Sequence, residues 1–226
     1  MFNYGNIQLK VCGITDQKSL EVIQKYSVSR VGLVSDYLYG PNTLSTKEIQ
    51  ELTIASYNLK LNPILLIGNV QMQEVISIVN DVAIKEVCIS NQYKNEEIEL
   101  LNNKTDAKIS ISVNYENFDY NFFEEILNNI SSFYYDLNIY RKDTIEKKSL
   151  VECEKQINQL KSFAKPLYLG GGINIDNIKE ANKTISPHGI DISTGLNNLI
   201  VWMRKSLKKS LIILGLTRFL YNKSFI

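Results

Sequence analysis

The chain has 226 residues, of which 44% are hydrophobic and 22% are charged, and its formal net charge is +1. This length and apolar content suffice for one domain with a full hydrophobic core. A charge so close to zero supplies no general field that attracts polyanions. Nucleic-acid binding would therefore need a local basic patch, and none is evident before the C-terminal segment.

The cysteines and the first residues of the chain indicate the cellular compartment of the protein. Cys12, Cys88 and Cys153 form no Cys-x-x-Cys pair, and three thiols cannot all pair with one another. This usage is typical of a reducing compartment rather than of a disulfide framework. The segment 1–8 is polar and lacks the apolar centre of a signal peptide. We therefore expect a soluble cytoplasmic protein with neither nucleic acid nor membrane as a partner.

Short apolar runs alternate with helical spacing of apolar residues along the first half of the chain. Strands are predicted at 7–12, 31–34, 63–67 and 84–89. Helices are predicted after a cap at Thr15 or Asp16, after Ser45, and at 71–80 and 95–102. Each strand and the helix that follows it form one βα unit.

The same alternation continues through the second half. Strands are predicted at 108–113, 133–136, 166–169 and 189–195, and helices at 118–127, 149–163 and 175–184, the last with Asn174 as its N-cap. Repeated βα units predict a parallel sheet, and about eight of them close a barrel. The predicted fold is therefore α/β, a single TIM (β/α)8 barrel, with a doubly wound open sheet as the alternative.

The C-terminal segment 197–226 is basic. It holds six Lys or Arg residues interleaved with apolar ones and no Asp or Glu. We expect 202–214 to form the eighth helix, packed on the sheet with its charges solvated. Contact with a membrane surface or an acidic partner is the alternative. No linker interrupts the chain, so a single domain is expected over 1–226.

Polar residues at the C-terminal ends of barrel strands face the ligand, which singles out Cys12 and Asp136. A thiol beside a turn can act as a base when a helix N-terminus or a nearby cation lowers its pKa, although isolated cysteines are often inert small hydrophobes. Asp136 fits a general acid or a solvated loop residue. The single histidine, His188, excludes a multi-histidine metal centre, so no metal is expected.

Small residues follow the last two predicted strands. Gly170, Gly171 and Gly172 allow close backbone approach to a ligand, and the helix after them would aim free N–H groups at an anion. A second small-residue turn, 193–195, follows the next strand. Barrel enzymes often bind phosphate between these two loops, although each alone fits an ordinary turn. A flavin or nucleotide phosphate would suit such a loop equally well.

Three segments together resemble one enzyme family. They are Lys-Val-Cys-Gly-Ile-Thr at 10–15, the Gly-Gly turn and helix start at 169–177, and Gly-Ile-Asp-Ile-Ser-Thr-Gly at 189–195. Their order and spacing resemble those of the phosphoribosylanthranilate isomerases, over residues 7 to about 210. The resemblance implies a TIM barrel without a cofactor. It also implies an Amadori rearrangement of an aminoaldose phosphate to an aminoketose phosphate in tryptophan biosynthesis.

The resemblance also implies roles for individual residues. Cys12 would be the general base and Asp136 the general acid. The family's basic element after the second strand is missing here, because 36–43 contains no Arg or Lys, so Arg141 or Lys142 would bind the substrate carboxylate instead. The residues that would hold the substrate phosphate are Gly171, Gly172, Ser193, Thr194 and Gly195.

Two other functions stay open from the sequence. One is a paralogue that isomerises another phosphosugar-amine with the same acid–base pair. The other is a barrel that binds a phosphorylated ligand without catalysis. In each case the partner is a small phosphosugar, and we expect a monomer or a homodimer.

Overall fold

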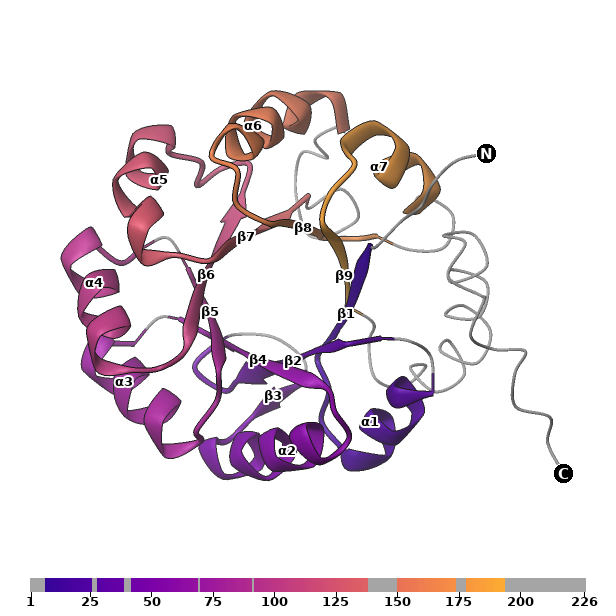
Figure 1. Ribbon diagram of the computed structural model, residues 1–226, viewed down its shortest axis with the longest axis vertical. Coiled ribbons are helices and arrows are strands. Elements are labelled where there is room, and N and C mark those ends of the chain that lie inside the picture. Colours follow the sequence, from indigo (N-terminus) through magenta and orange to yellow (C-terminus); the bar gives the residue numbers. More distant parts are fainter. Residues whose placement is uncertain are drawn as a thin grey trace, which may run out of the picture.

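The computed structural model describes residues 7–25, 28–38, 42–68, 70–90, 92–137, 150–173 and 178–193. Within these ranges strands and helices alternate, and Figure 1 shows the strands as a ring with the helices outside it. The strands are β1 (Gln8–Cys12), β2 (Arg30–Ser35), β3 (Thr43–Leu44), β4 (Asn62–Ile67), β5 (Glu86–Ser90), β6 (Lys108–Asn114), β7 (Ser132–Asp136), β8 (Leu167–Gly170) and β9 (Gly189–Ser193).

The helices lie between the strands in the order that the apolar spacing predicts. They are α1 (Gln17–Gln24), α2 (Thr46–Asn58), α3 (Met72–Asp81), α4 (Asn95–Lys104), α5 (Tyr120–Ile126), α6 (Leu150–Ser162) and α7 (Ile178–Ile185), with a 3₁₀ turn, η1, at Leu127–Asn129. None of these helices is long and apolar enough to span a bilayer. The predicted helix at 202–214, the cap at Asn174 and the basic segment 197–226 lie outside the described residues.

Strand pairing closes the ring. The strands pair in the order β1-β9-β8-β7-β6-β5-β4-β2, and β1 also pairs with β2, each time in parallel. The predicted TIM barrel is therefore confirmed, and the open sheet is wrong because β1 has a neighbour on both sides. The two-residue strand β3, which pairs with β2 outside the ring, was not predicted because it is too short to show a period.

Two helix starts follow from their capping residues. Asp16 accepts a hydrogen bond from the backbone N–H of Ser19 at 2.9 Å, so Asp16 rather than Thr15 caps α1. Ser45 begins α2 with a capping box, in which Glu48 accepts a hydrogen bond from the Ser45 N–H. Such caps satisfy backbone donors that a helix start leaves free.

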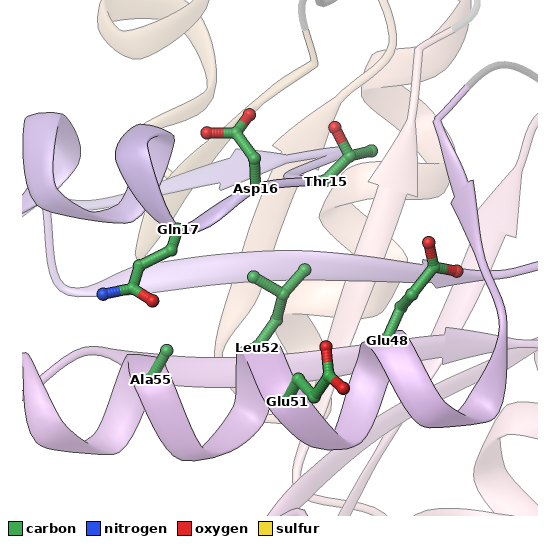
Figure 2. Close-up of a pocket in the computed structure, with 7 residues that line it drawn as sticks. All are labelled: Thr15, Asp16, Gln17, Glu48, Glu51, Leu52 and Ala55. Carbon is green, nitrogen blue, oxygen red and sulfur yellow. The ribbon is translucent and has the colours of Figure 1, made fainter.

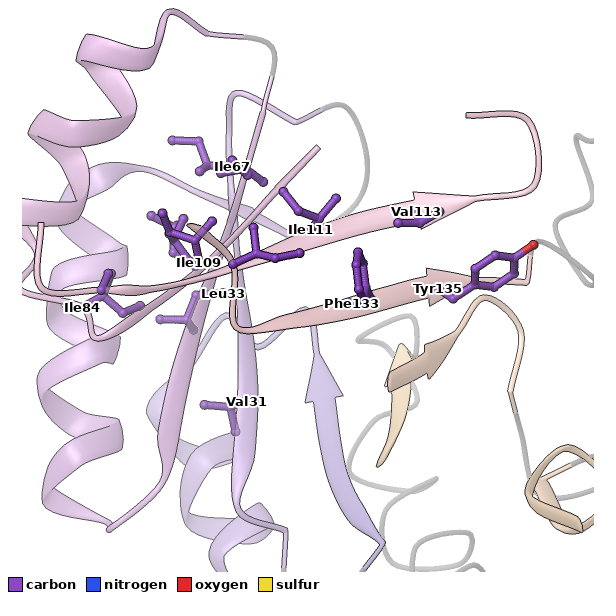
Figure 3. Close-up of a cluster of buried hydrophobic side chains, with 14 of the residues drawn as sticks. Val31, Leu33, Ile67, Ile84, Ile109, Ile111, Val113, Phe133 and Tyr135 are labelled. Atoms are coloured by element: carbon purple, nitrogen blue, oxygen red, sulfur yellow. The ribbon is translucent and has the colours of Figure 1, made fainter. Parts of the chain in front are cut away.

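Side chains alternate between the two faces of each strand, as the pleat requires. One set points toward the helices and forms the main hydrophobic core. Figure 3 shows part of this core, including Val31, Ile111, Val113 and Phe133. The opposite set fills the inside of the ring, and this set is unusually polar.

Two stacked tyrosines occupy the inside of the ring. The rings of Tyr134 and Tyr168 lie 4.7 Å apart at an interplanar angle of 12°. A cation lies close to each ring: Lys10 Nζ lies 4.9 Å from the Tyr134 centroid, and the Arg30 guanidinium lies 4.8 Å from the Tyr168 centroid. Gly189 makes room for this stack, because a Cβ there would lie 2.5 Å from the Tyr168 ring. Cation–π contacts thus order the centre of the barrel.

The half of the ring near the strand starts holds a partly buried ion pair. Arg30 forms an ion pair with Glu86, and its guanidinium also hydrogen-bonds Tyr134 Oη at 3.2 Å. Ser110 Oγ donates to Glu86 at 3.3 Å and lies 2.7 Å from Ser132 Oγ. Buried charges are tolerated when they are paired and hydrogen-bonded in this way.

Candidate active site

The strand register brings the predicted site residues to one rim of the barrel. Cys12 is the register partner of Ser193, and Asp136 is the register partner of Gly170. Because all strands run in the same direction, the C-terminal ends of β1, β7, β8 and β9 lie at the same rim. The strands β8 and β9 separate Asp136 from Cys12 along the ring. This is the end at which TIM barrels carry their active sites.

Cys12 faces the inside of the ring and is 7% exposed. Gly32 on β2 gives the thiol its space, because a Cβ at Gly32 would lie 2.6 Å from Cys12 Sγ. The chain then turns at Gly13, whose φ of 80° lies in the region that favours glycine. Burial raises the pKa of the Cys12 thiol to about 11, although Lys10 works in the opposite direction.

A buried ion pair lies directly below Cys12 and was not predicted. Lys10, 1% exposed, donates from Nζ to Asp191 Oδ2 at 2.5 Å. Burial alone would lower the pKa of Lys10, but Asp191, Cys12 and Tyr134 outweigh burial and raise it. A signal was present in the sequence: Lys10 and Asp191 each precede a predicted site residue by two positions, which places them on the same strand face.

Asp136 is the last residue of β7 and is partly buried. Its other register neighbour is Asn114 on β6. The next residue, Leu137, donates its N–H to the Gly170 carbonyl at 3.0 Å, which ties the end of β7 to β8. A carboxylate at this place is held by two neighbouring strands.

The turn after β8 has the backbone that its glycines predict. Gly171 and Gly172 have φ values of 79° and 87°, which lie in the left-handed region that other residues rarely adopt. Ser193 ends β9 and is exposed. The predicted residues Thr194, Gly195, Arg141 and Lys142 lie outside the described residues.

Ser90 is a further polar residue at this rim that sequence reasoning missed. It ends β5, and its Oγ is buried without a hydrogen-bond partner in the described part of the chain. A Cβ at Gly68, the residue after β4, would lie 3.4 Å from this oxygen. Ser90 therefore offers a free hydroxyl near the end of β5. His188 lies at the opposite end, where its Nδ1 accepts the Leu167 N–H at 3.2 Å.

A hollow between α1 and α2 does not suit the predicted anion. Figure 2 shows its lining, in which Asp16, Glu48 and Glu51 are the charged groups. Asp16 and Glu48 already serve as helix-capping groups. Three carboxylates repel a phosphate, so the barrel rim and not this hollow is the candidate site.

Several proteins similar to this chain are phosphoribosylanthranilate isomerases. No protein-family model matches the chain. The N-(5'-phosphoribosyl)anthranilate isomerase of Methanocaldococcus jannaschii is 26% identical over 205 residues, which cover 84% of this chain and 88% of the relative. The solved phosphoribosyl anthranilate isomerase of Thermus thermophilus matches with a TM-score of 0.73 at 14% identity, covering 94% of this chain and 100% of that one.

A third similar protein is a solved phosphoribosyl anthranilate isomerase in complex with reduced 1-(o-carboxyphenylamino)-1-deoxyribulose 5-phosphate. It matches with a TM-score of 0.64 at 16% identity, over 84% of this chain and 88% of that one. The structural likeness and the closed ring define a TIM-barrel protein with a thiol and a carboxylate at its C-terminal rim. Along most of its length the chain is similar to curated phosphoribosylanthranilate isomerases, at 20–26% identity.

Proposed function

We propose that the protein is an N-(5'-phosphoribosyl)anthranilate isomerase, which performs an Amadori rearrangement in tryptophan biosynthesis. The observation that carries the proposal is the shared rim: Cys12 and Asp136 end strands of one ring, next to the glycine turn after β8. The names of the curated relatives support the same reaction. The reaction needs one acid, one base and an anchor for the phosphate, and this rim offers a candidate for each.

The substrate phosphate would bind at the loops after β8 and β9. Gly171 and Gly172 carry no side chain, so a ligand can approach their backbone closely, and Ser193 supplies a hydroxyl donor. Thr194 and Gly195 would complete this anchor. Binding the phosphate at β8 and β9 places the ribose over the centre of the ring, between Asp136 on one side and Cys12 on the other.

The chemistry would begin with Asp136. Its carboxylic acid gives a proton to the ribose ring oxygen, the C1–O bond breaks, and the nitrogen lone pair forms the C1=N bond of a protonated Schiff base. The positive charge on nitrogen then acidifies the hydrogen on C2. Asp136 is left as a carboxylate, which regains a proton before the next turnover.

Cys12 would perform the second step. Its thiolate removes the proton from C2, and the electron pair of that C–H bond forms the C1=C2 bond while the C1=N pair returns to nitrogen. The resulting enol amine takes up a proton at C1 and loses the proton of its C2 hydroxyl, so that the C2=O bond of the aminoketose forms. The overall reaction is an isomerisation, so no oxidant, reductant or cofactor is needed.

The anthranilate carboxylate needs a cation that the loop after β2 does not supply, because 36–43 holds no Arg or Lys. We assign this role to Arg141 or Lys142 in the loop after β7. That loop begins beside Asp136, so a cation in it would reach the aromatic end of a substrate whose ring oxygen meets Asp136. We further propose a cytoplasmic monomer or homodimer.

The test is steady-state turnover of freshly generated phosphoribosylanthranilate, followed by anthranilate fluorescence. Cys12→Ala and Asp136→Asn are each expected to lower kcat by about 10²–10⁴-fold. Cys88→Ala is the matched control, because Cys88 is a second buried thiol inside the ring but lies on β5. Turnover that survives in both site variants would refute the assignment of the acid and the base.

One observation favours a second function, a barrel that binds a phosphorylated ligand without catalysis. The pKa of Cys12 is raised to about 11, so the thiol is predominantly neutral near pH 7. This function predicts thermal stabilisation by the substrate without turnover, and stabilisation that Cys12→Ala leaves unchanged. A paralogue is recognised differently: it would turn over another aminoaldose phosphate in a Cys12-dependent reaction but not the anthranilate compound.

A further inference from the structure

Cys12 lies on the same face of β1 as Lys10, two residues further along the strand. The register places Asp191 beside Lys10 and Ser193 beside Cys12, so the four residues occupy adjoining positions on β1 and β9. Lys10 is fixed on two sides: its Nζ donates to Asp191 Oδ2 at 2.5 Å and lies 4.9 Å from the centre of the Tyr134 ring. The ammonium group is therefore immobilised directly below the thiol.

We propose that Lys10 and Asp191 are opposing positioning residues for Cys12: the ammonium stabilises the thiolate, while the carboxylate holds the ammonium in place and restrains its effect. The proposal deepens the proposed function, because it concerns the base of that reaction. Neither residue needs to touch the substrate. Their opposite charges act on one sulfur from a common site in the ring.

The electrostatics of the site agree with this division. Burial is the largest influence on Cys12, followed by Lys10, which lowers the pKa of the thiol by its charge and by a hydrogen bond, and then by Asp191, which raises it. Among the described residues, the other titratable groups that interact with Lys10, Asp191 or Cys12 from inside the ring are Cys88 on β5 and Tyr134 on β7. Burial also raises the pKa of both groups, so both stay neutral near pH 7. The charges of Lys10 and Asp191 therefore dominate the electrostatic environment of Cys12.

The carboxylate is not neutralised by other donors. Asp191 Oδ1 is buried and has no hydrogen-bond partner among the described residues, while Oδ2 receives Lys10. The charge of Asp191 is therefore compensated chiefly by one ammonium, and that ammonium is shared with Cys12. Removing the carboxylate leaves the thiolate as the counter-ion of Lys10.

The experiment measures the rate at which iodoacetamide alkylates Cys12 between pH 7 and pH 10, because only the thiolate reacts at a useful rate. Alkylation is followed by mass spectrometry of the peptide that contains Cys12. The peptide that contains Cys153 serves as the internal control, since this fully buried thiol on α6 lies outside the ring and reports general opening of the fold.

Asp191→Asn is expected to speed the alkylation of Cys12 about tenfold at a given pH, and Lys10→Met to slow it about tenfold, which is the effect of one pKa unit in each direction. Lys10→Met/Asp191→Asn removes both charges and is expected to react more slowly than the wild type. A merely structural role predicts faster alkylation in every variant, because a loosened barrel exposes the thiol.

The proposal would be overturned if the alkylation rate of Cys12 changed in the same direction in Asp191→Asn and Lys10→Met. It would also be overturned if the alkylation rate of Cys153 rose together with that of Cys12. Where Lys10→Met does not fold, Asp191→Asn decides alone: it must react faster at Cys12 with Cys153 unchanged. The alkylation assay needs no turnover. The two failures can be told apart. If alkylation of Cys12 is faster in Asp191→Asn and slower in Lys10→Met, but the wild type does not isomerise phosphoribosylanthranilate, the proposed function is contradicted and this inference stands.

Discussion

The Cys12 thiol is almost completely buried, and this burial changes how its ionisation depends on pH. Burial raises the pKa of this thiol to about 11, so the neutral thiol is favoured over most of the accessible pH range. Below its pKa, the thiolate fraction of a group increases about tenfold for each pH unit. An ordinary cysteine has a pKa of about 8.5 and gains little thiolate above about pH 9.

The first prediction follows from this difference. In the wild-type chain, the rate of Cys12 alkylation is expected to keep rising between pH 9 and pH 10.5, by about tenfold per unit. Mass spectrometry of the Cys12 peptide measures the rate, and circular dichroism at each pH confirms that the chain is folded. A plateau by pH 9 would show that Lys10 compensates the burial of the thiol more fully than the structure indicates.

Gly32 is the second residue on which the position of Cys12 depends. A Cβ at Gly32 would lie 2.6 Å from Cys12 Sγ and 3.1 Å from Cys12 Cα. Gly32→Ala is therefore expected to destabilise the fold by about 1–3 kcal/mol, because the backbone of β1 must shift, and to lower turnover through the displaced thiol. Thermal unfolding and the fluorescence assay measure the two effects.

Gly170→Ala is the matched stability control for Gly32→Ala. A Cβ at Gly170 would lie 3.4 Å from Asp191 Cβ, which is an ordinary van der Waals contact. Its unfolding temperature is expected to stay close to that of the wild type. If Gly32→Ala were as stable as Gly170→Ala and fully active, Gly32 would not determine where Cys12 lies.

At the scale of elements, capping residues and periodicity made the alternation of strands and helices predictable. Asp16 and Ser45 start α1 and α2 as capping chemistry requires. Boundaries were less predictable. The strand expected at 84–89 is Glu86–Ser90, because the chain first passes through Ala83 at a positive φ of 52° after α3. An apolar run alone does not show where such a turn ends.

The loops after the strands carry the proposed specificity, and the loop after β7 gives the next prediction. Replacing both Arg141 and Lys142 by Ala is expected to raise KM about 10–100-fold with little change in kcat, because the lost charge-assisted contact binds substrate and transition state alike. Lys108→Ala is the control, since Lys108 is an exposed cation at the start of β6, at the other end of the barrel. An unchanged KM would refute the proposal that Arg141 or Lys142 binds the substrate carboxylate.

At the scale of the whole molecule, ring closure determined what the sequence could not reveal. Lys10 and Asp191 are 181 positions apart, and only the parallel pairing of β1 with β9 brings them together. The alternation of each strand predicted which of its residues share a face, but not which strands would be neighbours. The candidate base and acid were accessible from the sequence because each ends a strand. Their charged surroundings inside the ring were not.

The partly buried pair of Arg30 and Glu86 tests how far the polar interior of the ring depends on charge pairing. The side chains are 13% and 12% exposed. Arg30→Met is expected to destabilise the fold by about 1–3 kcal/mol, because Glu86 would keep a partly buried charge without its partner. Arg30→Met/Glu86→Met is expected to be less destabilised than the single variant. Urea unfolding measures the free energy of unfolding of both variants. A double variant that is less stable than Arg30→Met would show that the ion pair itself stabilises the barrel.

Whether this barrel isomerises phosphoribosylanthranilate is decided by the identity of the product. The substrate is incubated with the wild-type chain, with Cys12→Ala or with buffer. The products are separated by chromatography, and their masses are determined by mass spectrometry. The wild type is expected to form an aminoketose phosphate of the same mass as the substrate and Cys12→Ala to form it at least about 100-fold more slowly, whereas buffer yields only free anthranilate by hydrolysis. Free anthranilate as the sole product of the folded wild-type chain would contradict the account.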